Sequence, residues 1–240
     1  MVPGATSDIL PERVSPAFIK VASICAMATA LTTIAVHWLP DLWSTSTTFE
    51  SRVQLRHNAI YTGRLWIVLI HCVLVVISMA AIPCLLNGTA RLIAMFGLGS
   101  YVMFAFVEML RTSLSIFAVN RAWRAGYETS GDDMQKRAFR AALDNFGGVN
   151  DALFFLFLLA FTVGLFCYGV ALLSKSGMDQ RVGCLFLLWG VFNLPSLIGT
   201  IVGNEALGAP FDWVGRYFLP AARLLIGLWL WNVSTRVRTA

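Results

Sequence analysis

Charged residues are scarce in this chain of 240 residues, and they make up only 13% of it. A soluble globular domain usually carries about a quarter charged residues. At half that share, the chain lacks the polar groups needed to cover the surface of a soluble protein, whereas its hydrophobic residues amount to 58%. The composition therefore excludes an ordinary soluble domain and predicts an integral membrane protein.

Several motifs of known chemistry are also missing. The sequence contains no Gly-rich phosphate loop, no G-x-S-x-G, no H-E-x-x-H, no CxxC and no Cys/His pairing with metal-ligand spacing. Most of the five cysteines fall within apolar runs, where a thiol behaves as a small hydrophobic group. We therefore predict neither a disulfide framework nor a metal site, and the sequence names no cofactor.

The small excess of basic residues, a formal net charge of +5, raises the question of a nucleic-acid partner. These residues are spread over connectors and helix ends, as is usual for charges that flank membrane spans. No Lys/Arg-rich block and no interleaved aromatic platform is present. We therefore expect no nucleic-acid binding, and the partner that the composition indicates is the lipid bilayer.

Six apolar runs are long enough to cross a membrane as helices, which predicts an all-α fold, a polytopic bundle of six transmembrane helices in one domain. Between the third and fourth runs, residues 132–147 have the pattern of an amphipathic interfacial helix. The expected spans cover residues of about 18–39, 60–86, 91–119, 152–174, 182–202 and 217–233.

Orientation follows from the basic residues near the spans. With six spans, both chain ends share one side with the two short turns, and that side holds seven Lys/Arg. The long-connector side holds nine, but five of these lie in the connector with the interfacial segment. Discounting those five, the positive-inside rule predicts cytoplasmic N- and C-termini and a multi-pass protein of the cell (inner) membrane.

One acid and one base interrupt the third run, YVMFAFVEMLRTSLSIF. Glu108 and Arg111 are three residues apart, so they share a helix face and can touch. Ionisable groups at membrane depth usually face the bundle interior and pair there. We expect Glu108 to contact Arg111 and also to be shared with Arg223 of the last span.

Helical rise places the polar groups of several spans in the half of the bundle nearer the long connectors. We expect a polar pocket open on that side, lined by Arg64, His71, Glu108, Arg111, Asn193 and Arg223. Purely structural roles remain open for the same residues: Glu108 can simply neutralise a neighbouring arginine, Arg64 can reach the interface, and His71 can be a hydrogen-bonded core histidine.

A small-xxx-small pattern, GTIVG at Gly199–Gly203, predicts close helix contact. This contact can form within the chain or between two copies in a homo-oligomer. The sequence leaves both open.

The order of these features resembles the bacterial six-pass membrane family called domain of unknown function 4386. The resemblance lies in FAFVEMLRTSLSIFAVN, with its acid in mid-helix, in the fourth and fifth spans joined by SKSGMDQR, and in a final span that ends in GLWLW. Two features depart from the family: the short turns lack its usual proline, and Arg223 stands where an acid is expected. The resemblance implies the fold and a membrane location, and it brings no settled activity.

Three functions stay open at this point. The first is a membrane-embedded protein whose pocket, in the outer half, binds a small or lipid-like molecule. The second is an accessory subunit of a larger membrane complex. The third is an intramembrane enzyme acting on a lipid or isoprenoid, with Glu108 as acid/base and His71 as its helper.

Overall fold

The chain is described by a computed structural model that covers residues 15–43, 48–208 and 213–239. Residues 1–14 and 240, at the two ends of the chain, lie outside the described residues, and the cytoplasmic location of the termini stays a prediction. Within the described part the secondary structure is helical and contains no strand. The long helices are α1 (Pro16–Trp38), α3 (Ala59–Cys84), α4 (Gly88–Leu114), α6 (Asp133–Leu173), α7 (Met178–Val202) and α9 (Leu219–Thr239).

Short helical segments connect the long ones. Two π-helical segments, η3 and η5, continue directly into the α-helices beside them. The connecting segments are η1 (Leu39–Leu42), α2 (Phe49–Gln54), η2 (Leu55–His57), η3 (Ser115–Arg124), α5 (Ala125–Thr129), η4 (Glu205–Gly208) and η5 (Val214–Phe218).

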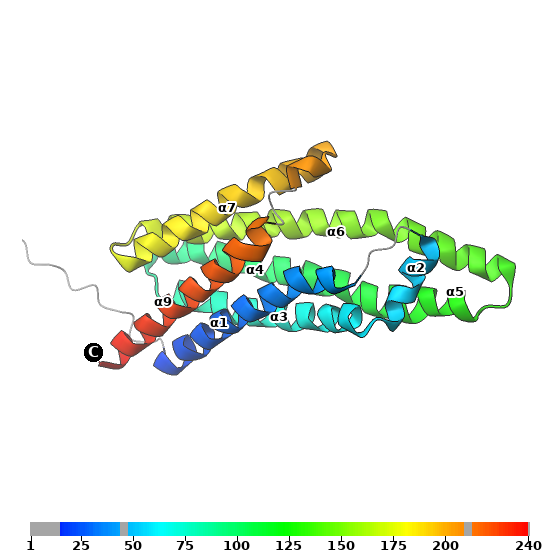
Figure 1. Cartoon of the computed structure of the whole chain (residues 1–240). Coiled ribbons are helices and arrows are strands. Elements are labelled where there is room, and N and C mark those ends of the chain that lie inside the picture. The colour runs from blue at the N-terminus through cyan, green and yellow to red at the C-terminus, as the bar shows by residue number, and fades with distance from the viewer. Residues whose placement is uncertain (1–14, 44–47, 209–212, 240) are drawn as a thin grey trace, which may run out of the picture.

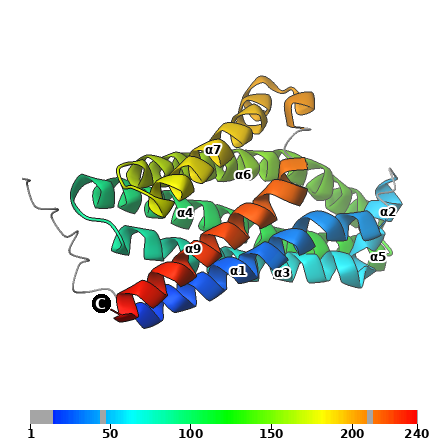
Figure 2. The ribbon, with the colours of Figure 1, turned by 60° about the vertical axis from the view of Figure 1, so that its left-hand side comes forward.

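The long helices form a bundle in which sequence neighbours run antiparallel (Figures 1 and 2). α1 packs against α3 and α9, α4 packs against α3 and α6, and α7 packs mainly against α6. The first and last helices therefore lie side by side although they are about 200 residues apart. The beginning of α1 and the end of α9 lie at the same end of the bundle (Figure 1).

Large apolar side chains cover the outside of the bundle. Leu31, Phe96, Phe106 and Ile201 are each more than three-fifths exposed. A continuous apolar surface of this kind would drive aggregation in water, whereas a bilayer solvates it. Within the described residues, five helical segments are long and apolar enough to cross a membrane: 16–42, 59–84, 88–129, 133–173 and 178–202. The protein is therefore a helical membrane protein.

The sixth predicted span, 217–233, corresponds to the end of η5 and most of α9. α9 is not among the five segments that qualify by length and composition, so the described structure supports five spans and leaves the count of six undecided. The apolar character of α9 is diluted because Arg223 lies within it and because it ends in the basic stretch TRVRT.

The predicted interfacial segment, 132–147, is not a separate helix. It forms the first turns of α6, which continues without a break through the predicted fourth span to Leu173. At 1.5 Å per residue, α6 is about 60 Å long, roughly twice the thickness of a bilayer core. Together with η3 and α5, its first half extends past the other helices at one end of the molecule (Figure 1). Asp132 caps α6 by accepting a hydrogen bond from the Met134 amide.

Glycines shape both the end of α7 and its contact with α6. Gly203 has a φ of +67° and forms the left-handed cap that ends α7. A close approach joins α6 and α7, where a Cβ on Gly183 would lie 3.0 Å from the carbonyl oxygen of Gly169. Small residues that bring two backbones together are typical of membrane helices.

Proline leaves one carbonyl in the bundle core without its helical donor. Pro83 has no N–H, so the carbonyl of Met79, four residues earlier in α3, loses its usual partner. The hydroxyl of Tyr168, on α6, donates to this oxygen at 3.1 Å. Both Met79 and Tyr168 are buried, and the bond joins α3 to α6.

Candidate functional site

A cavity of about 450 Å³ lies inside the half of the bundle where α1 ends and α3 and α9 begin. We call it the central cavity. Its lining comes from α1, η1, α3, α4, α6, η5 and α9, and it includes five of the six residues that the sequence predicts for a pocket: Arg64, His71, Glu108, Arg111 and Arg223. The volume is within the usual range for a small-molecule site.

The α4 wall of the cavity follows the periodicity of the helix. Tyr101, Phe104 and Glu108 are buried, whereas Phe106, between the last two, is exposed on the outer surface. Spacing of three and four residues keeps the buried side chains on one helix face. Glu108 therefore reaches the interior because of its place in the apolar pattern.

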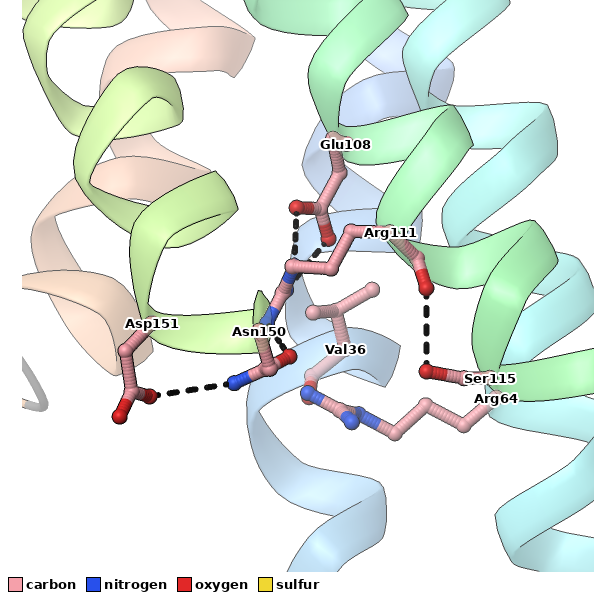
Figure 3. A network of polar contacts seen from close by, with 7 residues as sticks. All are labelled: Val36, Arg64, Glu108, Arg111, Ser115, Asn150 and Asp151. Atoms are coloured by element: carbon pink, nitrogen blue, oxygen red, sulfur yellow. Dashed lines mark hydrogen bonds and ion pairs between the residues drawn. The ribbon is translucent and has the colours of Figure 1, made fainter. Parts of the chain in front are cut away.

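Glu108 and Arg111 form a bidentate ion pair. The Nε and Nη2 atoms of Arg111 donate to the two carboxylate oxygens at 2.8 and 2.7 Å. Nη1 of Arg111 donates to Oδ1 of Asn150 at 3.3 Å, which links α4 to α6. Figure 3 shows this network beside Arg64, and the predicted contact between Glu108 and Arg111 is present.

Arg64 donates a hydrogen bond to a backbone carbonyl that lacks its helical donor because of a second proline. Pro40 cannot donate to the carbonyl of Val36, near the end of α1, and Nε of Arg64 donates to that oxygen at 2.9 Å. A cation at this place also opposes the partial negative charge of the helix end. Arg64 makes no ion pair with an acid among the described residues.

A further arginine lies nearer the solvent. Arg216, at the start of the last helical segment, contacts Asp41 through two hydrogen bonds of 2.6 and 2.9 Å. Its guanidinium carbon is 5.5 Å from the centroid of the Trp38 ring. The side chains of Arg216 and Asp41 are about one-third and one-half exposed, so this pair borders the open part of the cavity.

Arg223 is the most deeply buried charged residue of the cavity, with 2% of its surface exposed. Its guanidinium carbon lies 5.1 Å from the centroid of the Trp189 ring. Nε and Nη1 have no hydrogen-bond partner among the described residues. The prediction that Glu108 is shared with Arg223 was wrong, because no ion pair joins them and both oxygens of Glu108 accept from Arg111.

The last two predicted residues have ordinary partners. His71 lines the cavity, and its Nδ1 lies 2.7 Å from the hydroxyl of Thr32 on α1. Asn193 does not line the cavity: it is buried between α7 and α6, where its Nδ2 donates to Thr162 at 2.6 Å. The fifth span therefore contributes a polar contact between helices instead of a cavity wall.

Several lining residues were not predicted from the sequence, and the most informative are aromatic. Phe154, Phe157 and Phe161 of α6 line the cavity together with Phe104 of α4. The ring centroids of Phe104 and Phe157 are 4.8 Å apart. The spacing of three and four residues in α6 marks one helix face and could have indicated this wall. His37, Arg216 and Thr33 were also omitted.

In the part of the chain that the structure describes, no three His, Cys, Asp or Glu side chains lie together in a group that could bind a metal ion. His57, for example, contacts Glu128 at 3.0 Å. The polar groups of the central cavity are mainly guanidinium donors, which bind anions.

A search of protein-family profiles, curated proteins and solved structures gives no match to this chain.

Proposed function

We propose that this chain is a six-span membrane protein whose central cavity binds a small or lipid-like molecule. The observation that carries the proposal is the composition of the cavity wall, which combines four phenylalanines with four guanidinium groups. Ligand sites are mostly apolar with a few convergent polar groups. The resemblance to the bacterial six-pass family called domain of unknown function 4386 is part of this proposal.

The path of α9 supports a sixth span. It runs beside α1 along the bundle (Figures 1 and 2), and the hydroxyl of Ser23 donates to the carbonyl of Gly227 at 2.9 Å. Arg223 faces the interior, so it imposes no contact between a charge and lipid. With α9 crossing the membrane, α1 begins and α9 ends on one side, which the positive-inside rule assigns to the cytoplasm of a cell membrane. The cavity then opens in the outer half.

The directions of the charged side chains favour a pocket over an accessory subunit. A subunit that binds helix partners through charges would present them outward, whereas Glu108 and Arg223 are both buried inside the chain. An intramembrane enzyme with Glu108 as base is also less favoured, because each carboxylate oxygen already accepts a hydrogen bond from Arg111. A general base needs a lone pair directed at its substrate.

The proposal is tested by the molecules that purify with the protein. Val68→Phe would fill part of the cavity, because Val68 is buried in its lining on α3. Val73→Phe is the matched control, because Val73 lies on the outer face of the same helix. We expect mass spectrometry of organic extracts to find a ligand with wild type and Val73→Phe, and much less with Val68→Phe. Equal amounts in all three would contradict binding in the central cavity.

A further inference from the structure

The charges of the central cavity do not balance. Four arginines line it, together with a single carboxylate, that of Glu108. Arg111 occupies this carboxylate, and Asp41 pairs with Arg216 from beside the cavity. Arg64 and Arg223 therefore have no acidic partner among the described residues. Two positive charges inside a helical bundle are costly unless something pairs with them.

Arg223 is the residue that points most directly to a missing partner. Its side chain is buried in the cavity wall, and two of its nitrogen atoms have no hydrogen-bond partner among the described residues. A buried donor without an acceptor is rare in folded proteins. The ring of Trp189 stabilises the cation from one face, but it cannot accept all its hydrogen bonds. An acid group in the cavity would supply them.

The aromatic part of the cavity lining indicates the rest of the ligand. Phe104, Phe157 and Phe161 present apolar rings to the same space, and Phe154 extends the row. The rings of Phe154 and Phe157 are stacked, with centroids 5.6 Å apart. Such a surface gains free energy by covering hydrocarbon. A small inorganic anion would leave this wall uncovered.

We infer that the central cavity takes an anionic amphiphile, whose acid group lies between Arg223 and Arg64 and whose apolar part lies along the phenylalanines. The inference rests on the proposed function and names its ligand class. A carboxylate and a phosphate both have the required chemistry, because a guanidinium binds either through paired hydrogen bonds. A neutral molecule can accept hydrogen bonds from Arg223 but leaves its charge unpaired, and a cationic molecule would add to the positive charge.

The experiment uses the full chain purified in a nonionic detergent. Three probes share one acyl chain: oleate carries a carboxylate, oleoyl lysophosphatidate carries a phosphate, and monoolein is neutral. We expect oleate, lysophosphatidate or both to raise the melting temperature and to appear bound in native mass spectra, and monoolein to do neither. An effect of oleate alone identifies a carboxylate ligand, and an effect of lysophosphatidate alone identifies a phosphate ligand.

Variants of Arg223 test the anchor itself. In Arg223→Met, the anionic probes should bind about tenfold more weakly or worse, since a charge-assisted hydrogen bond is lost. The ligand-free protein should melt at a higher temperature, because an unpaired buried charge is removed. Arg223→Lys should keep part of the affinity. Arg91→Met is the control, since Arg91 is exposed near the other end of α4 and should leave binding unchanged.

Each contrary outcome has a distinct meaning. Equal binding of monoolein and oleate would overturn the ligand class and leave the proposed function standing. Unchanged anion binding by Arg223→Met would also overturn the inference. If none of the three probes bound, both the inference and the proposed binding of a lipid-like molecule would fail.

Discussion

Arg111 holds both carboxylate oxygens of Glu108 from one helical turn away, at 2.8 and 2.7 Å. The pair lies at the inner face of α4, with 9% of the Glu108 side chain and 26% of the Arg111 side chain exposed. In a bidentate pair of this kind, each carboxylate oxygen accepts one charge-assisted hydrogen bond. No ion pair joins Glu108 to Arg223, so Arg223 has no acidic partner among the described residues.

Glu108→Gln should destabilise the protein by about 2–4 kcal/mol, because it leaves Arg111 partly buried without a counter-charge. The double variant with Arg111→Gln should recover part of the loss, as expected for a coupled pair. Thermal melting in detergent measures both effects. Arg52→Gln serves as the control: it breaks the exposed Arg52–Asp144 pair, and the expected change is below about 1 kcal/mol.

A double-mutant cycle tests whether Glu108 and Arg223 interact. Because no hydrogen bond or ion pair joins them, the effects of Glu108→Gln and Arg223→Met on stability should be closer to additive than those of Glu108→Gln and Arg111→Gln. Equal or greater coupling to Arg223 would mean that Glu108 is shared between two arginines after all.

Tyr168 and Tyr101 are equally buried but differ in their hydroxyl contacts. Tyr168→Phe should cost about 1–2 kcal/mol, because the carbonyl of Met79 loses the donor that replaces the missing amide of Pro83. Tyr101→Phe should be neutral or slightly stabilising, because the Tyr101 hydroxyl has no partner within the described residues. Similar melting temperatures for the two variants would show that the Tyr168 bond contributes nothing.

The replacement of a missing amide by a hydroxyl can be tested through the proline. In a Pro83→Ala background the amide of residue 83 can donate to Met79. Tyr168→Phe should then cost less than it does in the wild type, and the same melting assay measures the difference. If Tyr168→Phe lowered stability equally in both backgrounds, the hydroxyl of Tyr168 would not be replacing the missing amide.

Gly183→Val should destabilise by about 1–3 kcal/mol, because its Cβ would lie 3.0 Å from backbone atoms of Gly169 and Leu173. Gly99→Val is the matched control within a helix, since a Cβ there meets nothing within 4 Å. Native gels and melting curves compare the two variants. Equal losses would contradict a close approach of α6 and α7 at Gly183.

The number of spans has a direct test. A reporter that fluoresces only in the cytoplasm should be bright when fused after Thr239 and dark when fused after Asn204, at the end of α7. The reason is that α9 lies between the two sites and, in our proposal, crosses the membrane. Equal signals at the two sites would show that α9 does not cross.

The sequence predicted the helical membrane class, because long apolar runs and low charge determine it. It did not predict the continuity of α6: a polar segment followed by an apolar one suggested two helices, whereas no residue between them breaks the helix. The contact between Glu108 and Arg111 was predictable because it is local. The environment of Arg223 was not, because it depends on which helix faces which.

The two prolines separate what the sequence determines from what the tertiary structure determines. By itself it determines that Pro40 and Pro83 have no amide hydrogen, so the carbonyls four residues earlier need other donors. The tertiary structure decides that these donors are Arg64 and Tyr168. Only the packing of α3 on α1, and of both α3 and α6 on α4, brings them within reach. The sequence alone determines that each carbonyl needs a donor, and the arrangement of distant helices determines which side chain donates.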